Sequence, residues 1–239
     1  MPWILAKRKN GLVQGVKARF YAFRDRPEKD VSKMDFVTET FYMKIDFVFT
    51  GKPYILAPEE KYVIVFTGFL KIDEPGNYVF YVKTSGGVTL FVDGKELIDS
   101  WRENTSAILH SEKIFVDKGY HAFRLLYFNS RRFGEISFGW IKPSGEHTVI
   151  PTSNLFTTIG DHVFFTGLSN GWSVKLISAK SDEEKTCVTF RGVCGVHLPI
   201  SQQPFYAYIS VHNEEKKRIF ATTDPLEIWG GDEYEFTLR

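Results

Sequence analysis

The stretch from residue 62 to residue 94 constrains the fold of this chain most strongly. Its β-branched and aromatic residues suit a pleated and half-buried surface, and they form runs at 62–66, 78–82 and 88–92. Turn-forming residues separate these runs, namely Asp-Glu-Pro-Gly-Asn at 73–77, Gly86-Gly87 and the hairpin pair Asp93-Gly94. Helical periodicity does not occur in this stretch. The sequence therefore predicts a meandering antiparallel β-sheet.

Several short motifs follow one another in order between residues 16 and 151. They read Val16-Lys17-Ala18-Arg19-Phe20-Tyr21, Phe66-Thr67-Gly68-Phe69-Leu70, Gly76-Asn77-Tyr78-Val79-Phe80, Phe91-Val92-Asp93-Gly94-Lys95 with Leu97-Ile98-Asp99-Ser100-Trp101, Lys118-Gly119-Tyr120-His121 with Leu126-Tyr127-Phe128-Asn129, and Phe138-Gly139-Trp140 with Ile150-Pro151. Together they resemble the protective-antigen-type ("PA fourteen") family, which occurs in bacterial toxins, glycosidases and yeast adhesins, usually as a carbohydrate-binding or adhesion module. The resemblance implies a β-sandwich over residues 12–156.

One departure from that family bears on function. Its sugar-binding members carry two consecutive aspartates just before the glycine of the turn that precedes the Val-Asp-Gly-Lys strand. Those carboxylates hold a calcium ion, which in turn holds sugar hydroxyls. Here the matching positions are Ser85 and Gly86, and neither supplies the carboxylate oxygens that calcium prefers. We therefore expect no metal site and no cofactor, so that glycan binding would be independent of calcium.

Residues 157–239 are expected to form a second domain. Strand-like runs occur at 162–166, 172–177, 186–190, 205–212, 218–222 and 233–238, and this spacing of short strands favours an immunoglobulin-like sandwich. Asn-Gly-Trp at 170–172 and Ile-Trp-Gly-Gly-Asp at 228–232 resemble the C-terminal β modules of some archaeal surface proteins. Residues 1–11 are interpreted as an arm or an added edge strand. The fold class is thus all-β, with two consecutive antiparallel sandwiches.

The chain has two cysteines, Cys187 and Cys194. If residues 186–195 form a hairpin centred near Phe190-Arg191, the two side chains face each other across the strands and can form a disulfide. The alternative is that both are small buried apolar residues. No second Cys or His pair accompanies them, so the spacing does not indicate a zinc site.

Composition excludes several classes of protein. The net charge is +1, and the basic residues are scattered among acidic ones, so we expect no binding to nucleic acid. No apolar run approaches the ~18–20 residues that cross a bilayer. The N-terminus lacks the pattern of a secretory signal, which leaves a removed signal or an export route such as a virus particle. We expect a location on an extracellular surface or a virion.

The candidate ligand-binding residues lie in loops and turns, where a rigid sandwich usually places them. They are Trp101, Arg102, Asn104, Asn129, Arg131 and Asp93. Aromatic rings can stack on sugars, and Asn and Asp side chains can hold hydroxyl groups. Three of these residues have structural alternatives: core packing for Trp101, a solvated basic loop for Arg131 and a hairpin turn for Asp93.

No catalytic motif was found among the patterns for nucleophilic, phosphate-binding or zinc-dependent enzymes, so we expect a protein that is not an enzyme. The first functional hypothesis is a surface protein that binds glycans or mediates adhesion or host attachment. The second is a structural component of an archaeal virion or surface array that self-associates. The third is an accessory domain of a glycosidase. The sequence does not identify the glycan, the oligomeric state or the host.

Overall fold

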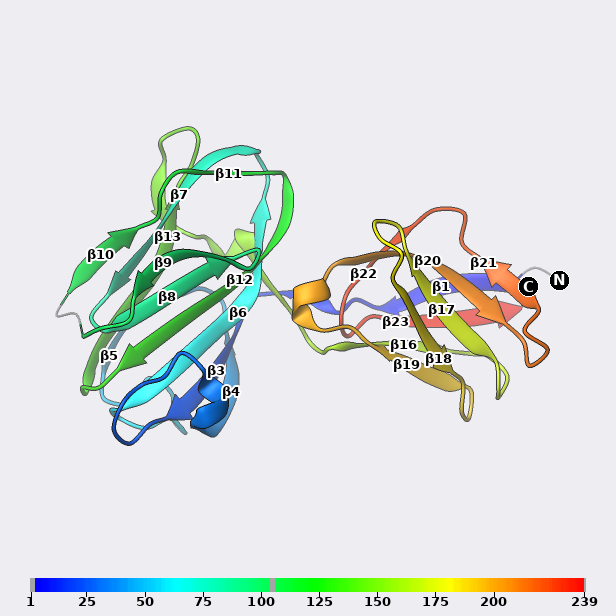
Figure 1. Cartoon of the computed structure of the whole chain (residues 1–239), viewed down its shortest axis with the longest axis horizontal. Coiled ribbons are helices and arrows are strands. Elements are labelled where there is room, and N and C mark those ends of the chain that lie inside the picture. The colour runs from blue at the N-terminus through cyan, green and yellow to red at the C-terminus, as the bar shows by residue number, and fades with distance from the viewer. Residues whose placement is uncertain (1–2, 104–105, 239) are drawn as a thin grey trace. The chain divides into compact units, whose positions relative to one another are not determined.

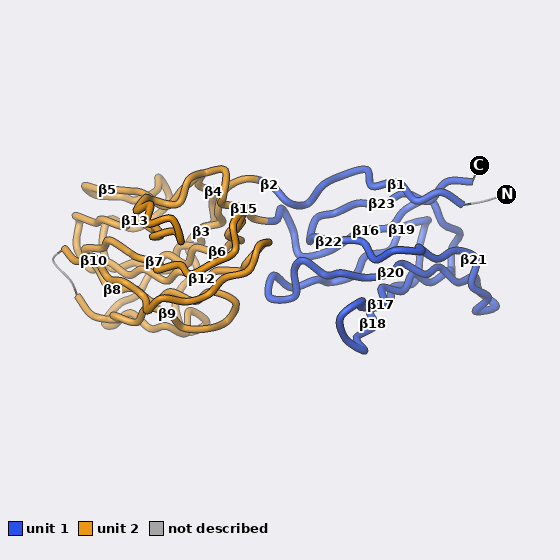
Figure 2. Tube along the Cα trace, turned by 90° about the horizontal axis from the view of Figure 1, so that it is seen from above, with its two compact units in different colours: residues 1–13, 158–239 blue, residues 14–157 orange. Residues whose placement is uncertain are grey.

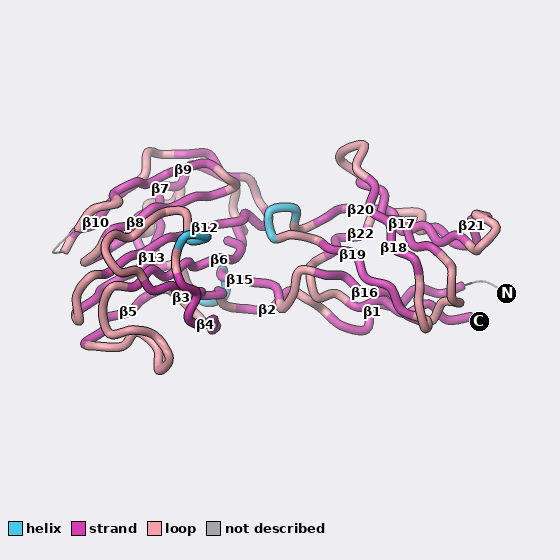
Figure 3. The backbone as a smooth tube through the Cα atoms, turned by 60° about the horizontal axis from the view of Figure 1, so that its bottom comes forward, coloured by secondary structure: helices cyan, strands magenta, loops and turns pink. Residues whose placement is uncertain are grey.

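The computed structural model of the chain describes residues 3–103 and 106–238. The described residues form strands, loops and three short 3₁₀ turns, which are η1 (Val31–Lys33), η2 (Thr152–Asn154) and η3 (Ile200–Gln202) (Figure 3). The chain divides into two compact units (Figure 2). We call residues 14–157 the first sandwich. The described parts of 1–13 and 158–239 are the second sandwich.

Two antiparallel sheets make up the first sandwich (Figure 1). One contains β2 (Leu12–Gln14), β15 (Leu155–Thr158), β6 (Tyr62–Ile72), β12 (Gly119–Asn129), β8 (Gly87–Val92) and β9 (Lys95–Ser100) in that order, with β3 (Val16–Ala22) on β6 and β4 (Asp35–Tyr42) on β3. The other contains β10 (Ala107–His110), β7 (Gly76–Thr84), β13 (Phe133–Ile141) and β14 (His147–Val149), with β11 (Ile114–Val116) on β7 and β5 (Asp46–Thr50) on β13. The all-β class and the antiparallel meander are therefore confirmed.

The core between these sheets is aromatic. Phe66, Phe80 and Trp140 are each at most 1% exposed, and they alternate along their strands with outward residues. Central strand β6 is buried on both faces because the segment between β3 and β4 folds over the outside of its sheet. Phe23 from that segment packs on Val63, Val65, Leu126 and Phe128. The run at 62–66 thus lies between the core and the covering segment, as its apolar residues on both faces predict.

The second sandwich also has two sheets. One runs β1 (Trp3–Lys9), β23 (Glu233–Leu238), β16 (His162–Thr166) and β19 (Val193–His197). The other runs β18 (Glu184–Val188), β17 (Ser173–Ser178), β20 (Phe205–His212) and β21 (Arg218–Ala221), with β22 (Leu226–Ile228) on β20. Buried side chains from both sheets share one core. All pairs are antiparallel except β16 with β23, which is parallel. The immunoglobulin-like class and the archaeal likeness stay predictions.

The N-terminal segment takes the second of its two expected roles. Strand β1 pairs antiparallel with β23 from Trp3 opposite Leu238 to Lys9 opposite Glu233. Trp3 and Leu5 pack against the core of the second sandwich. Asp232, which is fully buried, accepts hydrogen bonds from the Gly11 and Trp229 amides and pairs with Lys7 at 2.7 Å. The segment is therefore an edge strand of the second sandwich. In the sequence, the first sandwich lies between this strand and the rest of the second sandwich.

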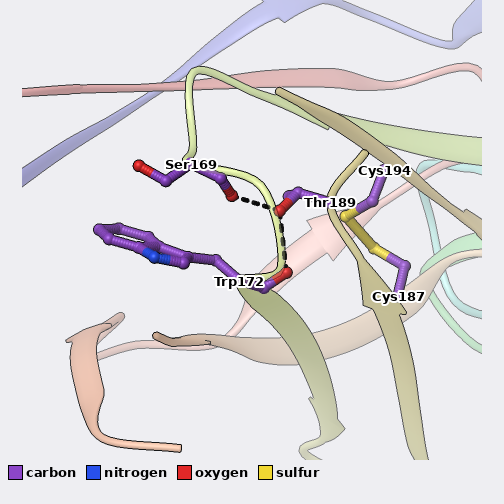
Figure 4. Close-up of a disulfide and its surroundings, with 5 residues drawn as sticks. All are labelled: Ser169, Trp172, Cys187, Thr189 and Cys194. Atoms are coloured by element: carbon purple, nitrogen blue, oxygen red, sulfur yellow. Dashed lines mark hydrogen bonds between the residues drawn. A yellow bond between two sulfur atoms is a disulfide. The ribbon is translucent and has the colours of Figure 1, made fainter. Parts of the chain in front are cut away.

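The structure contains a disulfide between Cys187 and Cys194 (Figure 4). A tight turn at Phe190–Val193 joins the two strands, with positive φ at Arg191 and Gly192. The strands then separate, because β18 pairs with β17 while β19 pairs with β16. The sequence predicts a disulfide across one hairpin. The structure differs in one respect, because the bond joins strands that belong to the two different sheets of the sandwich. Beside it, the Thr189 hydroxyl lies 2.5 Å from the Ser169 carbonyl oxygen and 3.0 Å from that of Trp172.

Candidate functional site

Several loops meet at one end of the first sandwich, which we call the loop end: residues 23–34, 51–61, 85–86, 101–103 and 129–133. Backbone hydrogen bonds hold the loops to one another. The Phe23 amide donates to the Lys61 carbonyl (3.1 Å), and the Gly51 amide donates to the Arg132 carbonyl (2.7 Å). Two ion pairs add to these contacts, Arg132 with Glu59 at 2.9 Å and Arg131 with Glu103 at 3.9 Å. Four of the six candidate ligand-binding residues belong to this end, and Asn104 lies outside the described residues.

Asn129 is fully buried, which corrects its interpretation as an exposed loop residue. Its Nδ2 lies 2.6 Å from the Arg131 carbonyl oxygen, 2.9 Å from that of Phe133 and 3.1 Å from the Tyr62 hydroxyl. These contacts fix the turn between β12 and β13. Burial raises the pKa of Tyr62 to about 12, so its hydroxyl stays protonated at neutral pH. Asn129 therefore positions the loop and is not available to a ligand.

Trp101 also has a structural role. Its indole N–H donates to the Pro27 carbonyl at 3.0 Å, and its ring packs edge-on against Phe128. Lys29 from the same segment pairs with Asp99 at 2.7 Å and lowers the pKa of that carboxyl. These contacts hold the 23–34 segment over the outer face of β6 and β12. The core-packing alternative for Trp101 thus matches its surroundings.

The residues at the family's calcium position do not fit the metal. Ser85 is 4% exposed, and both its amide and its hydroxyl are bonded to the backbone of Glu135. Gly86 has no room for any side chain, because a Cβ there would lie 1.9 Å from the Phe128 carbonyl oxygen. In the described part of the chain, the amide oxygen of Asn129 and the hydroxyl of Tyr127 are buried near this turn without a hydrogen-bond partner. One amide oxygen and one phenol do not replace the carboxylates that calcium requires.

The loop end exposes apolar and basic side chains beside acidic ones such as Asp25, Glu28, Glu60 and Glu103. Phe133 is 48% exposed, and Ile55 and Leu56 stand out from the 51–61 loop at 77% and 63%. The side chains of Arg131 and Arg132 are 57% and 71% exposed. Sequence reasoning overlooked Ile55 and Leu56, although an apolar pair between Pro53 and Pro58 is unusual for a loop. The loop end therefore offers an aromatic face and guanidinium donors to a ligand.

Asp93 lies elsewhere. Strand β8 runs from Gly87 at the loop end to Val92, about 16 Å away at strand spacing. Asp93 has a positive φ of 49° in the turn to β9, and its carboxylate accepts the Ala122 amide and contacts His121 Nδ1 at 2.6 Å. His121 Nε2 lies 2.9 Å from the Asp117 carbonyl oxygen. The hairpin alternative for Asp93 thus matches its geometry, and the Asp93–His121 pair borders a separate pocket of about 410 Å³.

Two further findings concern the described residues as a whole. No group of three or more His, Cys, Asp and Glu side chains is arranged there to hold a metal ion. No helix in the same ranges is long and apolar enough to cross a membrane.

Comparison with known proteins agrees with this geometry. The PA14 domain family model matches residues 14–154. The anti-sigma-I factor RsgI3 of Acetivibrio thermocellus is 29% identical over 153 residues, which are 64% of this chain and 23% of that protein. The chain thus spans about a quarter of that relative's length.

Two solved structures share the fold. An anti-sigma factor domain-containing protein from Clostridium clariflavum has a TM-score of 0.53 and 20% identity, covering 83% of this chain and 69% of its own. A PA14 sugar-binding domain from an RTX adhesin has a TM-score of 0.51 and 13% identity, covering 61% and 99%.

Proposed function

Because this chain belongs to the PA14 domain family, we propose that its first sandwich binds glycans through the loop end, without calcium. The observation that carries the proposal is the surface of that end, where Phe133 is exposed beside Arg131 and Arg132 on hydrogen-bonded loops. An aromatic ring can stack on the apolar face of a sugar, and guanidinium groups can donate to its oxygens. The sugar-binding PA14 domain of the RTX adhesin supports this function by its shared fold.

The proposed setting is an extracellular surface, where the domain would serve adhesion or attachment and no catalysis. The disulfide supports it, because such bonds persist mainly in oxidising compartments. Family membership supports glycan recognition, and the closed turn at Ser85 and Gly86 supports recognition that needs no metal.

A glycan-array screen with calcium and with chelator tests the proposal. Binding should survive chelation. Phe133→Ala should weaken it by about 1 kcal/mol, roughly fivefold, with no loss of melting temperature. Phe36→Ala is the matched control, because Phe36 is 58% exposed on β4 and lies outside the loop end. Absence of binding to every glycan, or equal effects of the two variants, would contradict the loop-end site.

A second candidate is a ligand-sensing module of a regulatory protein. The match to an anti-sigma-I factor over 153 residues, 64% of this chain, favours it. In that case the chain would bind a glycan but would not itself capture a sigma factor in a pull-down. Capture of a sigma factor by the chain would assign it the regulatory activity directly.

The remaining alternatives are a self-assembling virion or surface-array component and a glycosidase accessory domain. The assembly hypothesis predicts that residues 2–5 are buried against a neighbour. Trp3 and Leu5 pack in their own chain, and Pro2 lies outside the described residues. Analytical sedimentation at high protein concentration tests the assembly hypothesis. A protein that stays monomeric at every concentration would contradict it.

A further inference from the structure

The pocket beside Asp93 has features of a binding site that the loop-end function does not use. It measures about 410 Å³ and lies between the β8–β9 hairpin, β11 and the start of β12. Its lining includes Asp93, Lys95, Leu97, Lys113, Phe115 and His121. We call it the Asp93 pocket. It is separated from the loop end by the length of β8.

One wall of the Asp93 pocket is apolar. Phe115 is 64% exposed, because its neighbours Ile114 and Val116 on β11 point into the core and the strand alternation sends Phe115 outward. Leu97 and Ile114 are partly buried beside it. An exposed aromatic ring at the edge of a cavity can stack on a flat apolar ligand face.

The charges of the pocket favour an anion. Neither Lys95 nor Lys113 has an ion-pair partner within residues 3–103 and 106–238. The Asp93 carboxylate is already occupied by His121 and the Ala122 amide, so it does not neutralise the lysines. The exposed Asp117 supplies one further negative charge. Both nitrogens of His121 face acceptors, which favours the charged ring and leaves the pocket positive overall.

From this arrangement we propose that the Asp93 pocket binds an anionic sugar residue, a hexuronic acid, as a second glycan subsite. The apolar face of the sugar ring packs on Phe115, while its carboxylate pairs with Lys95 and Lys113. The choice of a sugar as the ring rests on the glycan-binding function proposed above. The preference for a negative charge rests on the two lysines together with the charged His121 ring, which outweigh Asp93 and Asp117.

The test is a titration of the full chain, followed by NMR chemical shifts, with methyl β-glucuronoside and with methyl β-glucoside. We expect shifts around residues 92–97 and 113–121 with the glucuronoside, and affinity at least about tenfold weaker for the neutral glucoside. The double variant Lys95→Gln/Lys113→Gln should lose this preference. Lys52→Gln, at the loop end, is the matched control and should keep it.

Three outcomes would overturn the inference: equal binding of the two glycosides, shifts confined to the loop end, or an unchanged preference in the double variant. Each leaves the loop-end function intact, because that function is tested by Phe133→Ala on the array. Conversely, Phe115→Ala could weaken glucuronoside binding while Phe133→Ala leaves it unchanged. That result would establish the Asp93 pocket as a binding site independent of the loop end.

Discussion

His121 shows how one residue can link several parts of this fold. Its ring nitrogens contact the Asp93 carboxylate of the β8–β9 hairpin and the Asp117 carbonyl before β12. A neutral imidazole donates only one hydrogen bond, so both contacts are hydrogen bonds only when the ring is charged. The bond to Asp93 is the main cause that raises the pKa of His121 above its usual 6.5.

The stability of the first sandwich should therefore depend on pH through His121. Since the folded state holds the proton more tightly than the unfolded state, the contribution is complete below about pH 6.5 and is lost as pH rises through the raised pKa. Melting curves from pH 6 to pH 9 should show a fall that His121→Gln abolishes. The control variant is His197→Gln, which replaces an exposed histidine of the second sandwich. It should retain the fall in melting temperature. An equal slope in wild type and His121→Gln would refute this linkage.

Gly86 is a second single residue on which the loop end depends. A Cβ at this position would lie 1.9 Å from the Phe128 carbonyl oxygen, and backbone cannot move aside cheaply. We expect Gly86→Ala to destabilise the first sandwich by about 2–3 kcal/mol, the upper range for overpacking. Urea unfolding measures this cost. Gly160→Ala is the control, because its nearest neighbours would be 3.6 Å away. A cost below about 0.5 kcal/mol would show that the turn has an alternative conformation.

Among the elements, the β18–β19 pair depends most on a covalent bond. Both are edge strands, one in each sheet of the second sandwich, and the Cys187–Cys194 bond joins them. Buried Cys194 also contributes to the shared core. The bond therefore holds the two layers together along the edge where neither strand has a second neighbour in the described sheets.

Removing this bond should weaken the second sandwich selectively. The cysteines are 7 residues apart, and closing so short a loop stabilises the fold by about 2.5 kcal/mol in the chain-entropy treatment. Scanning calorimetry of Cys187→Ala/Cys194→Ala should show one transition lowered and the transition of the first sandwich unchanged. Dithiothreitol should reproduce the shift in the wild type and have no effect on the variant. A matching shift in both transitions would contradict separate units.

At the scale of the whole molecule, the second sandwich is discontinuous in sequence. Its β1 precedes the first sandwich, and its remaining strands follow it (Figure 2). The first sandwich has its own core and closes with the Gly15 amide bonded to the Leu155 carbonyl at 2.8 Å. The first sandwich is thus built from one contiguous stretch of chain, whereas the second needs two separate stretches.

This topology predicts how fragments behave. Residues 14–157 should fold alone, with a melting temperature close to that of the intact first sandwich. Residues 158–239 alone should melt lower, because Trp3, Leu5 and the Lys7–Asp232 pair are missing. Joining residues 3–11 behind residue 239 through a short turn should restore the loss, since Trp3 lies opposite Leu238. Equal stability with and without the appended strand would show that β1 contributes nothing.

The sequence by itself determined the all-β class, the meander of the first sandwich and the loss of the calcium carboxylates. These features depend on local turn chemistry, on two-residue alternation and on the identity of Ser85 and Gly86, all of which are readable along the chain. It also placed Trp101, Arg102 and Arg131 beside the loops, although it could not tell an exposed side chain from a buried one.

Only the tertiary structure decided which of these residues face solvent and which strands are neighbours. Asn129 is buried among contacts that include the distant Tyr62 hydroxyl. Trp101 is partly buried, because its indole donates to the distant Pro27 carbonyl and its ring packs on Phe128. The pairing of β1 with β23 joins residues more than two hundred positions apart, and the disulfide joins strands of different sheets. Such contacts depend on how buried faces are matched across the whole fold, and no local pattern records that match.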